Sequence, residues 1–240
     1  MALQMLVCPH DTVHHPERWY RLVQYLTPRI AAEIHFELSL DFEDFQSHLS
    51  TVDLVYANPA DSLKLITQRN FVPLARPGRC YDEAMFLSSV EHPADSIHAM
   101  HGATVATVTT MLPAKVALHA LKQQAIIPGE LVHRDSWQAV VGCIYRGEVP
   151  FGIVYRDSFE SLSAQGKSMA HVIAATNEQA AFHSMLLAPQ HAGLRQPLQA
   201  ALIGMQADPV GQEILAEMGC GPWTLIGELE LAEMARLALH

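Results

Sequence analysis

Short runs of apolar and β-branched residues alternate with longer amphipathic segments in the first third of the chain. The runs predict strands, and the segments, whose apolar residues recur every three or four positions, predict helices. Asn58 can cap the third of these helices, and Pro59 suits its first position. This order predicts a parallel sheet covered by helices. The expected strands are 3–8, 34–38 and 52–56, and the expected helices are 16–31, 41–49 and one that starts at 58–59.

A second strand-and-helix series follows an extended segment at 75–90 that could pass from one lobe to another. "MAHVIAATNEQAAFHSMLLAPQ" then supplies two extended segments, the second of which could cross back, and the tail is mostly helical with a break at "GCGPW". We therefore expect two α/β lobes, residues 1–82 with 181–240 and residues 83–180, with a ligand cleft between them. The expected strands of this series are 104–108 and 151–154, and the expected helices are 113–124, 137–145 and 158–164.

Composition supports a folded protein with a large core, since 50% of the residues are apolar and 17% are charged. The net charge of −10, with no cluster of Lys or Arg, disfavours nucleic acid and anionic membrane surfaces as partners. The first residues, MALQMLVCPH, have neither the basic region nor the long apolar region of a signal peptide. We therefore expect a cytoplasmic protein if Met1 is the native start, or an exported one whose signal was removed.

The four cysteines are Cys8, Cys80, Cys143 and Cys220, and no two of them form a CxxC pair. Their spacing predicts no zinc site. They could form two bridges in an oxidising compartment, but most lie in apolar or strand-like settings, which favours reduced, buried thiols.

The segment "ATVTTMLPAKVALHALKQQ" places Thr109 and Thr110 just before a helix with Pro113 in its first turn. Free amides at a helix N-terminus, together with two hydroxyl groups, can bind an anion without a lysine. The alternative is that Thr110 only caps the helix.

The segment "CPHDTVHHPERW" lies between the first strand and the first helix, where open α/β sheets carry ligand loops. His10 and Asp11 are candidate ligand-binding residues here. His10, His14 and His15 with Asp11 could also be metal ligands, but their spacing is loose and we predict no metal site. Asp11 or Thr12 could instead cap the helix.

Three further strand-to-helix junctions carry polar or aromatic side chains. Tyr56 in "DLVYANPADS" could contact a ligand or be a core tyrosine, and Asn58 begins the next helix. Asp135 or Ser136 in "HRDSWQAV" could cap a helix whose first turn carries Trp137. Asp157 in "IVYRDSFESL" follows a strand and begins another helix. No GxSxG, Walker, HExxH or GxGxxG motif accompanies them, so the pattern favours a binder of a small polar ligand over an enzyme.

Three quoted segments carry a resemblance to a known family. "CPHDTVHHPERWYRLVQYLTPRI", "VDLVYANPADSLKLI" and "YRGEVPFGIVYRDSFESL" resemble, in that order, segments of the phosphate/phosphite/phosphonate substrate-binding proteins of ABC transporters. The resemblance runs from about residue 3 to residue 219. It implies a type II periplasmic-binding-protein fold, with two α/β lobes joined by two extended hinge crossings, and no catalytic activity or cofactor.

Within that resemblance, Thr109 and Thr110 correspond to a Ser/Thr-rich anion loop, and Tyr56 to the position at the strand end. Tyr81 matches an aromatic residue near the first hinge crossing, and Asp157 an acidic residue that would face a cationic or hydroxyl group of the ligand. The chain departs from the family at three places. Trp137 replaces a histidine after the retained Ser136, the anion loop is reduced to "TTML", and Pro150 replaces an aspartate.

The resemblance implies capture of a small oxyanion for an ABC-transporter permease or a sensor protein, by a monomer in the periplasm. A bulky Trp137 would shrink the pocket or stack on a flat or apolar part of the ligand. Two alternatives stay open: an enzyme on a related two-lobed fold, and a metal-binding protein that uses His10, His14 and His15.

Overall fold

A computed structural model describes residues 2–12, 15–39, 41–219 and 221–239. The chain divides into two compact units, each built around its own sheet. Unit 1 comprises Met1–Cys80 and Phe182–Ala232, and unit 2 comprises Tyr81–Ala181 and Glu233–His240. None of the described helices is long and apolar enough to cross a bilayer.

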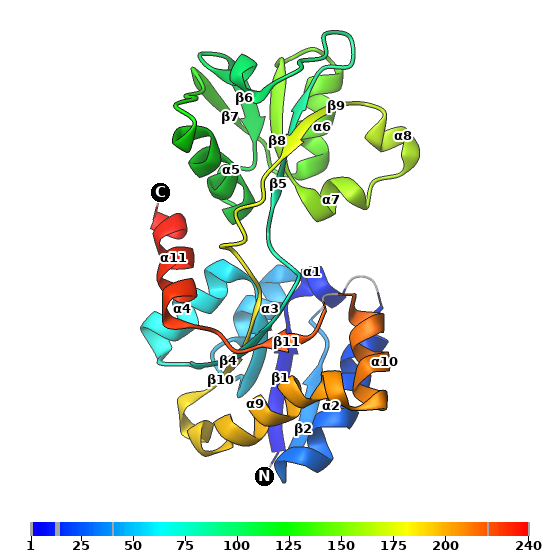
Figure 1. Cartoon of the computed structure of the whole chain (residues 1–240), viewed down its shortest axis with the longest axis vertical. Coiled ribbons are helices and arrows are strands. Elements are labelled where there is room, and N and C mark those ends of the chain that lie inside the picture. The colour runs from blue at the N-terminus through cyan, green and yellow to red at the C-terminus, as the bar shows by residue number, and fades with distance from the viewer. Residues whose placement is uncertain (1, 13–14, 40, 220, 240) are drawn as a thin grey trace. The chain divides into compact units, whose positions relative to one another are not determined.

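Unit 1 contains a six-stranded sheet in the order β11-β4-β10-β3-β1-β2 (Figure 1). β1, β2 and β3 are parallel, whereas β10 runs antiparallel between β3 and β4. The strands are β1 (Ala2–Val7), β2 (Glu33–Glu37), β3 (Leu54–Ala57), β4 (Val72–Pro77), β10 (Ser184–Leu187) and β11 (Trp223–Thr224).

Helices cover both faces of the unit 1 sheet because successive β1 side chains alternate between two cores. Leu3, Met5 and Val7 pack with side chains of α2, α9 and α10, whereas Leu6 belongs to a second cluster with residues of α3 and α4. The helices are α1 (Pro9–Thr12), α2 (Glu17–Ile30), α3 (Phe42–His48), α4 (Pro59–Arg69), η2 (Pro189–Leu194), α9 (Arg195–Gly204), η3 (Met205–Ala207), α10 (Pro209–Met218) and α11 (Glu228–Leu239), the last of which ends in unit 2.

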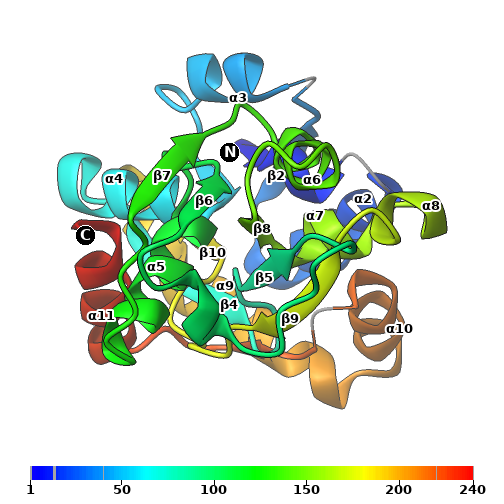
Figure 2. The ribbon, with the colours of Figure 1, turned by 90° about the horizontal axis from the view of Figure 1, so that it is seen from above.

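Unit 2 contains a five-stranded sheet in the order β7-β6-β8-β5-β9, with α5 and α6 on opposite faces (Figure 2). The close approach of α6 to β8 requires Gly152, because a Cβ there would lie 2.5 Å from Ile144 Cδ1. The elements are β5 (Ala84–Ser88), η1 (Ile97–Met100), β6 (Thr104–Thr107), α5 (Leu112–Gln123), β7 (Glu130–His133), α6 (Trp137–Tyr145), β8 (Phe151–Tyr155), α7 (Arg156–Glu160), α8 (Ala164–Lys167) and β9 (His171–Ala175).

The structure differs from the sequence expectations at several elements. The helix expected over 158–164 is two short helices, α7 and α8, because Ser163 caps a new helix by accepting from the Gly166 amide. The edge strand β7 was not expected. Residues 233–240, expected in lobe 1, group with unit 2, where Leu237 packs against Leu112 and Val116 of α5.

The cysteines also differ from expectation. Cys8 and Cys143 are free and buried, as expected, but Cys80 is disulfide-bonded. The expectation of a reduced thiol is therefore wrong for Cys80. Cys220 lies outside the described residues.

Candidate functional site

The carboxyl ends of β1 and β3 in unit 1 bring together a cysteine, a carboxylate and an imidazole. One ligand atom each from Cys8, Asp11 and His183 lie within 4.8 Å of one another. The Asp11 Oδ2 and His183 Nδ1 atoms are 2.8 Å apart. His183 reaches this place because β10 is antiparallel to β3, with Ser184 opposite Ala57. The strand that follows His183 therefore starts where β1 and β3 end.

Burial and local hydrogen bonds shape this group. Cys8 is fully buried, and that burial raises the pKa of its thiol to about 11, with His183 opposing the rise and Asp11 adding to it. The backbone carbonyl of Asp11 accepts hydrogen bonds from Arg18 Nη2 at 2.8 Å and from Trp19 Nε1 at 3.1 Å. Asp11 is therefore held by its backbone while its carboxylate faces His183. The interpretation of Asp11 as a helix cap is wrong, since the N-cap of α2 is Pro16.

Tyr56 lies in the core beside this group. It is 2% exposed, and its ring centroid is 4.7 Å from that of Trp19, 5.5 Å from that of His183 and 5.9 Å from that of Trp223. The expectation of a core tyrosine is confirmed. A ligand-binding role for Tyr56 stays a prediction.

Asn58 begins α4 as the sequence predicts. Its side-chain oxygen accepts from the Asp61 amide at 3.0 Å, and its Nδ2 donates to Asp61 Oδ2 at 2.7 Å. The same Nδ2 lies 3.9 Å from Cys8 Sγ. Asn58 therefore links the start of α4 to the Cys8 group.

Thr110, in the threonine segment of unit 2, does not cap α5. The N-cap of α5 is Met111, which makes no side-chain cap, and Thr110 is exposed. Thr109 is half-buried and contacts His133, the last residue of β7, because β7 pairs with β6 in parallel. The capping interpretation of Thr110 is wrong.

The Thr109–His133 contact fixes the tautomer of the imidazole. The amide of Thr109 lies 3.3 Å from His133 Nδ1, and Thr109 Oγ1 lies 2.9 Å from the same atom. An amide nitrogen can only donate, so Nδ1 must be an acceptor and the ring proton lies on Nε2, which faces Asp135 at 3.6 Å. In this arrangement the Thr109 hydroxyl donates to His133, whereas the exposed Thr110 hydroxyl is not held in that contact.

A second group in unit 2 surrounds Tyr155, at the end of β8. Its hydroxyl lies 2.9 Å from Asp157 Oδ2 and 3.3 Å from Asp82 Oδ1, and its ring centroid is 6.5 Å from that of the half-buried Trp137. Ser136 caps α6 by accepting from the Ala139 amide at 3.2 Å, which confirms the predicted cap. The carboxylates of Asp157 and Asp82 thus converge on one phenol, beside an aromatic ring.

Residues 7–227 match the family model described as the periplasmic phosphonate substrate-binding protein of ABC transporters. The chain belongs to this family. The expected resemblance is therefore confirmed, and the chain is a substrate-binding protein of the ABC-transporter type. No protein of curated function matches it by sequence.

Solved structures confirm the fold of this substrate-binding protein. PhnD1 from Prochlorococcus marinus, in complex with methylphosphonate, has a TM-score of 0.73 at 11% identity, over 99% of this chain and 97% of that one. The sulphonate-binding protein SsuA from Escherichia coli has a TM-score of 0.68 at 14% identity, over 99% and 85%. XAC2383 from Xanthomonas citri, bound to chloride, has a TM-score of 0.71 at 17% identity, over 99% and 96%. The predicted type II periplasmic-binding-protein fold is confirmed.

The remaining predicted residues of this phosphonate-family protein lie apart from these groups or at their margins. His10 is exposed, with its ring centroid 6.2 Å from that of His183. Tyr81 is half-buried in the segment that leads into β5. His15 is exposed and pairs with Glu17, and His14 lies outside the described residues. Among the residues that the structure describes, no metal-ligand group contains His10 or His15.

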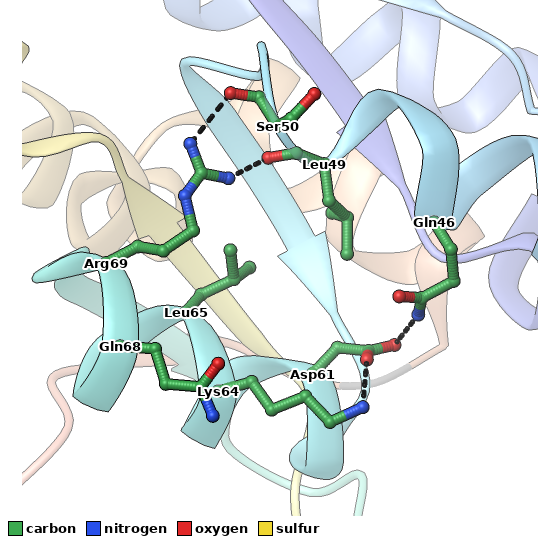
Figure 3. A pocket seen from close by; sticks show the side chains of 8 residues that line it. All are labelled: Gln46, Leu49, Ser50, Asp61, Lys64, Leu65, Gln68 and Arg69. Atoms are coloured by element: carbon green, nitrogen blue, oxygen red, sulfur yellow. Dashed lines mark hydrogen bonds and ion pairs between the residues drawn. The ribbon is translucent and has the colours of Figure 1, made fainter.

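A pocket of about 300 Å³ between α3 and α4 is a poor candidate for the binding site (Figure 3). Its polar groups already contact one another: Gln46 donates to Asp61 at 2.8 Å, Lys64 lies 3.6 Å from Asp61, and Arg69 donates to the carbonyls of Leu49 and Ser50. No predicted site residue lines it.

Sequence reasoning missed several participants in these groups, among them Cys8, Asp82, His133, Tyr155 and His183. His183 could have been found by pairing the returning strand antiparallel beside β3, since its first residues must then lie at the carboxyl end of β3. His133 required recognition of β7, which has four residues and no strong alternation.

Proposed function

We propose that this substrate-binding protein captures a small tetrahedral oxyanion of the phosphonate class and delivers it to an ABC-transporter permease. The observation that carries the proposal is the start of α5, a 12-residue helix without a side-chain cap, preceded by Thr109 and by the exposed Thr110, whose hydroxyl lies outside the Thr109–His133 contact. Amides in a first helical turn lack intrahelical acceptors and lie at the positive end of the helix dipole. An anion with several oxygens can accept from them and from a hydroxyl group together.

The group around Tyr155 supports a more specific ligand class. When ionised, the carboxylates of Asp157 and Asp82 can accept hydrogen bonds but cannot donate them, so they suit an ammonium or hydroxyl group and repel a bare anion. We propose an aminoalkyl phosphonate whose phosphonate group contacts α5 and whose ammonium group contacts Asp157. PhnD1 in complex with methylphosphonate supports the phosphonate part alone.

Calorimetric titration with methylphosphonate, 2-aminoethylphosphonate, phosphate, phosphite and methanesulfonate tests the anion part. The Thr109→Val/Thr110→Val double variant should lose about 2 kcal/mol or more of binding free energy, since a hydrogen bond to a charged group contributes about 1.5–3 kcal/mol. That loss is about thirtyfold or more in the dissociation constant. Thr67→Val, an exposed threonine on α4 whose hydroxyl bonds to the Leu63 carbonyl, is the matched control and should bind as the parent does.

Equal affinity of the double variant and the parent would contradict a ligand role for these threonines. No binding of any of the five anions would contradict the oxyanion proposal itself.

The ammonium part is tested by Asp157→Asn in the same titration. This variant should weaken 2-aminoethylphosphonate about tenfold or more while leaving methylphosphonate unchanged, because only the former carries the positive charge, and removing one partner of a charged hydrogen bond costs about 1.5–3 kcal/mol. Equal weakening of both ligands would assign Asp157 a structural role through Tyr155 instead.

The Cys80 disulfide supports location in the periplasm, since disulfides persist mainly in oxidising compartments. We further propose a monomer, which sedimentation velocity tests directly. A sensor protein is the alternative partner. Binding of the ligand-bound protein to its cognate permease would favour the permease over a sensor protein.

A further inference from the structure

Three side chains at the carboxyl end of β1 offer three different ligand atoms in a small space. Cys8 Sγ, one carboxylate oxygen of Asp11 and one ring nitrogen of His183 all lie within 4.8 Å of one another. They come from three separate places in the chain: the residue after β1, helix α1 and the residue before β10. The sheet pairing brings them together, so the arrangement is part of the fold of unit 1.

The donor set suits a borderline-soft divalent cation. Thiolate, imidazole and carboxylate are the three ligand types of protein-bound Zn²⁺, with bonds of about 2.3, 2.0 and 2.0–2.2 Å. Tetrahedral bonds of those lengths separate ligand atoms by roughly 3.3–3.7 Å. The Asp11–His183 distance of 2.8 Å must therefore open by about half an ångström, by that same geometry, to admit an ion between them. Mg²⁺ and Ca²⁺ prefer oxygen ligands alone and do not fit.

Unit 1 contains a second His–Asp pair, and comparison with it shows which ligand atom the Asp11–His183 pair has in addition. His191 Nε2 lies 2.8 Å from Asp53 Oδ1, the same separation as in the Asp11–His183 pair, and both pairs are largely buried. Among the described residues, only the Asp11–His183 pair has a cysteine within reach. The two pairs therefore differ by a single donor, the Cys8 thiol.

Neighbouring groups hold this donor set in place. The amide of Cys8 donates to the Tyr56 carbonyl at 2.8 Å, and the backbone of Asp11 is fixed by Arg18 and Trp19. Asn58 Nδ2 lies 3.9 Å from Cys8 Sγ, where it can donate weakly to a thiolate. Such outer contacts orient ligands and contribute to metal affinity. Cys8 also stays a free thiol in a chain that forms a disulfide at Cys80.

We propose that Cys8, Asp11 and His183 bind one zinc-class divalent cation. On binding, the Cys8 S–H bond breaks, a zinc–sulfur bond forms and the proton passes to the buffer. The site does not depend on which oxyanion the protein carries.

The test uses the full chain, stripped with a chelator, and two probes. Zn²⁺ is titrated by calorimetry, and Co²⁺ by its thiolate-to-metal charge-transfer absorption, which reports a sulfur ligand directly. The parent should bind one ion per chain and show the band. Cys8→Ser should remove the band and weaken Zn²⁺ at least tenfold, and His183→Gln should weaken Zn²⁺ by a similar factor.

Matched controls separate the site from other donors. Cys143→Ser removes the other free buried cysteine, and His191→Gln breaks the second His–Asp pair, so both should keep the band and the affinity. His10→Gln/His15→Gln should also keep both, since neither residue belongs to the group. A parent without the charge-transfer band overturns the proposal whatever the variants do. A band lost in Cys143→Ser and kept in Cys8→Ser overturns it as well.

Discussion

At the scale of single residues, the candidate ligand groups depend on contacts between segments that are distant in the sequence. Asn58 and Ser136 could be predicted because each caps a helix that begins at its own position. His183 could not, because its position depends on which strand β10 pairs with. The capping alternative for Thr110 was wrong for a related reason, since local hydroxyl spacing cannot tell a cap from an exposed side chain next to one.

Glu148 gives a prediction for pH dependence. Its carboxylate accepts from Arg146 Nε at 2.6 Å, from Cys143 and from Arg134, and these bonds, that of Arg146 first, lower its pKa from 4.5 to about 2. A depressed pKa in the folded state contributes stability above pH 4.5, and that contribution is lost as the pH falls toward 2. Glu148→Gln should therefore flatten the decline in unfolding free energy across this window.

Urea unfolding at a series of pH values between 2 and 6 measures the effect, with the exposed Glu160→Gln on α7 as the control. A decline as steep in Glu148→Gln as in the parent would show that the bonds to Arg146 and Arg134 contribute nothing to the acid sensitivity of unit 2.

At the scale of elements, periodicity and start signals predicted the segments for which bounds were given, apart from 158–164, to within about two residues, the usual uncertainty at element ends. The elements that were missed or misdrawn are short. β7 has four residues, and α7 and α8 have five and four, so each is too short for its pattern to distinguish a strand from a helix or a loop. Tertiary pairing forms β7, and the local cap by Ser163 starts α8.

Helix capping gives a prediction at this scale. Ser136→Ala should destabilise the protein by about 1 kcal/mol, the usual loss when an N-cap side chain is removed. Thr110→Ala is the matched change at α5, where Met111 and not Thr110 is the N-cap, and should stay within about 0.5 kcal/mol of the parent. Chemical denaturation of the two variants distinguishes them. A loss for Thr110→Ala as large as for Ser136→Ala would restore the capping interpretation.

At the scale of the whole molecule, the sequence predicted the fold class better than it predicted the boundaries of the two units. The family segments predict two lobes, but they do not show that the last helix is shared. Residues 233–240 group with unit 2 because Leu237, 1% exposed, packs against Val116, Ala180 and Ala181 and because Lys115 Nζ donates to the Ala238 carbonyl at 2.5 Å.

The end of α11 should therefore stabilise unit 2. Leu237→Ala should cost about 2–5 kcal/mol, as for other large-to-small changes in a core. Leu229→Ala, on the same helix but 86% exposed, should be nearly neutral. Hydrogen exchange of the β6 and β8 amides reads out unit 2 selectively. Equal protection of these amides in the two variants would mean that α11 adds nothing to unit 2.

The position of β10 in the unit 1 sheet constrains the order in which the protein can be assembled during translation. β10 pairs with both β3 and β4, so two strands from the first 80 residues lack a neighbour until residue 187 has left the ribosome. Most of unit 2, residues 81–181, is made in the interval. A nascent chain can thus complete its second sheet before its first, and during that time the edges of β3 and β4 are open to wrong pairing.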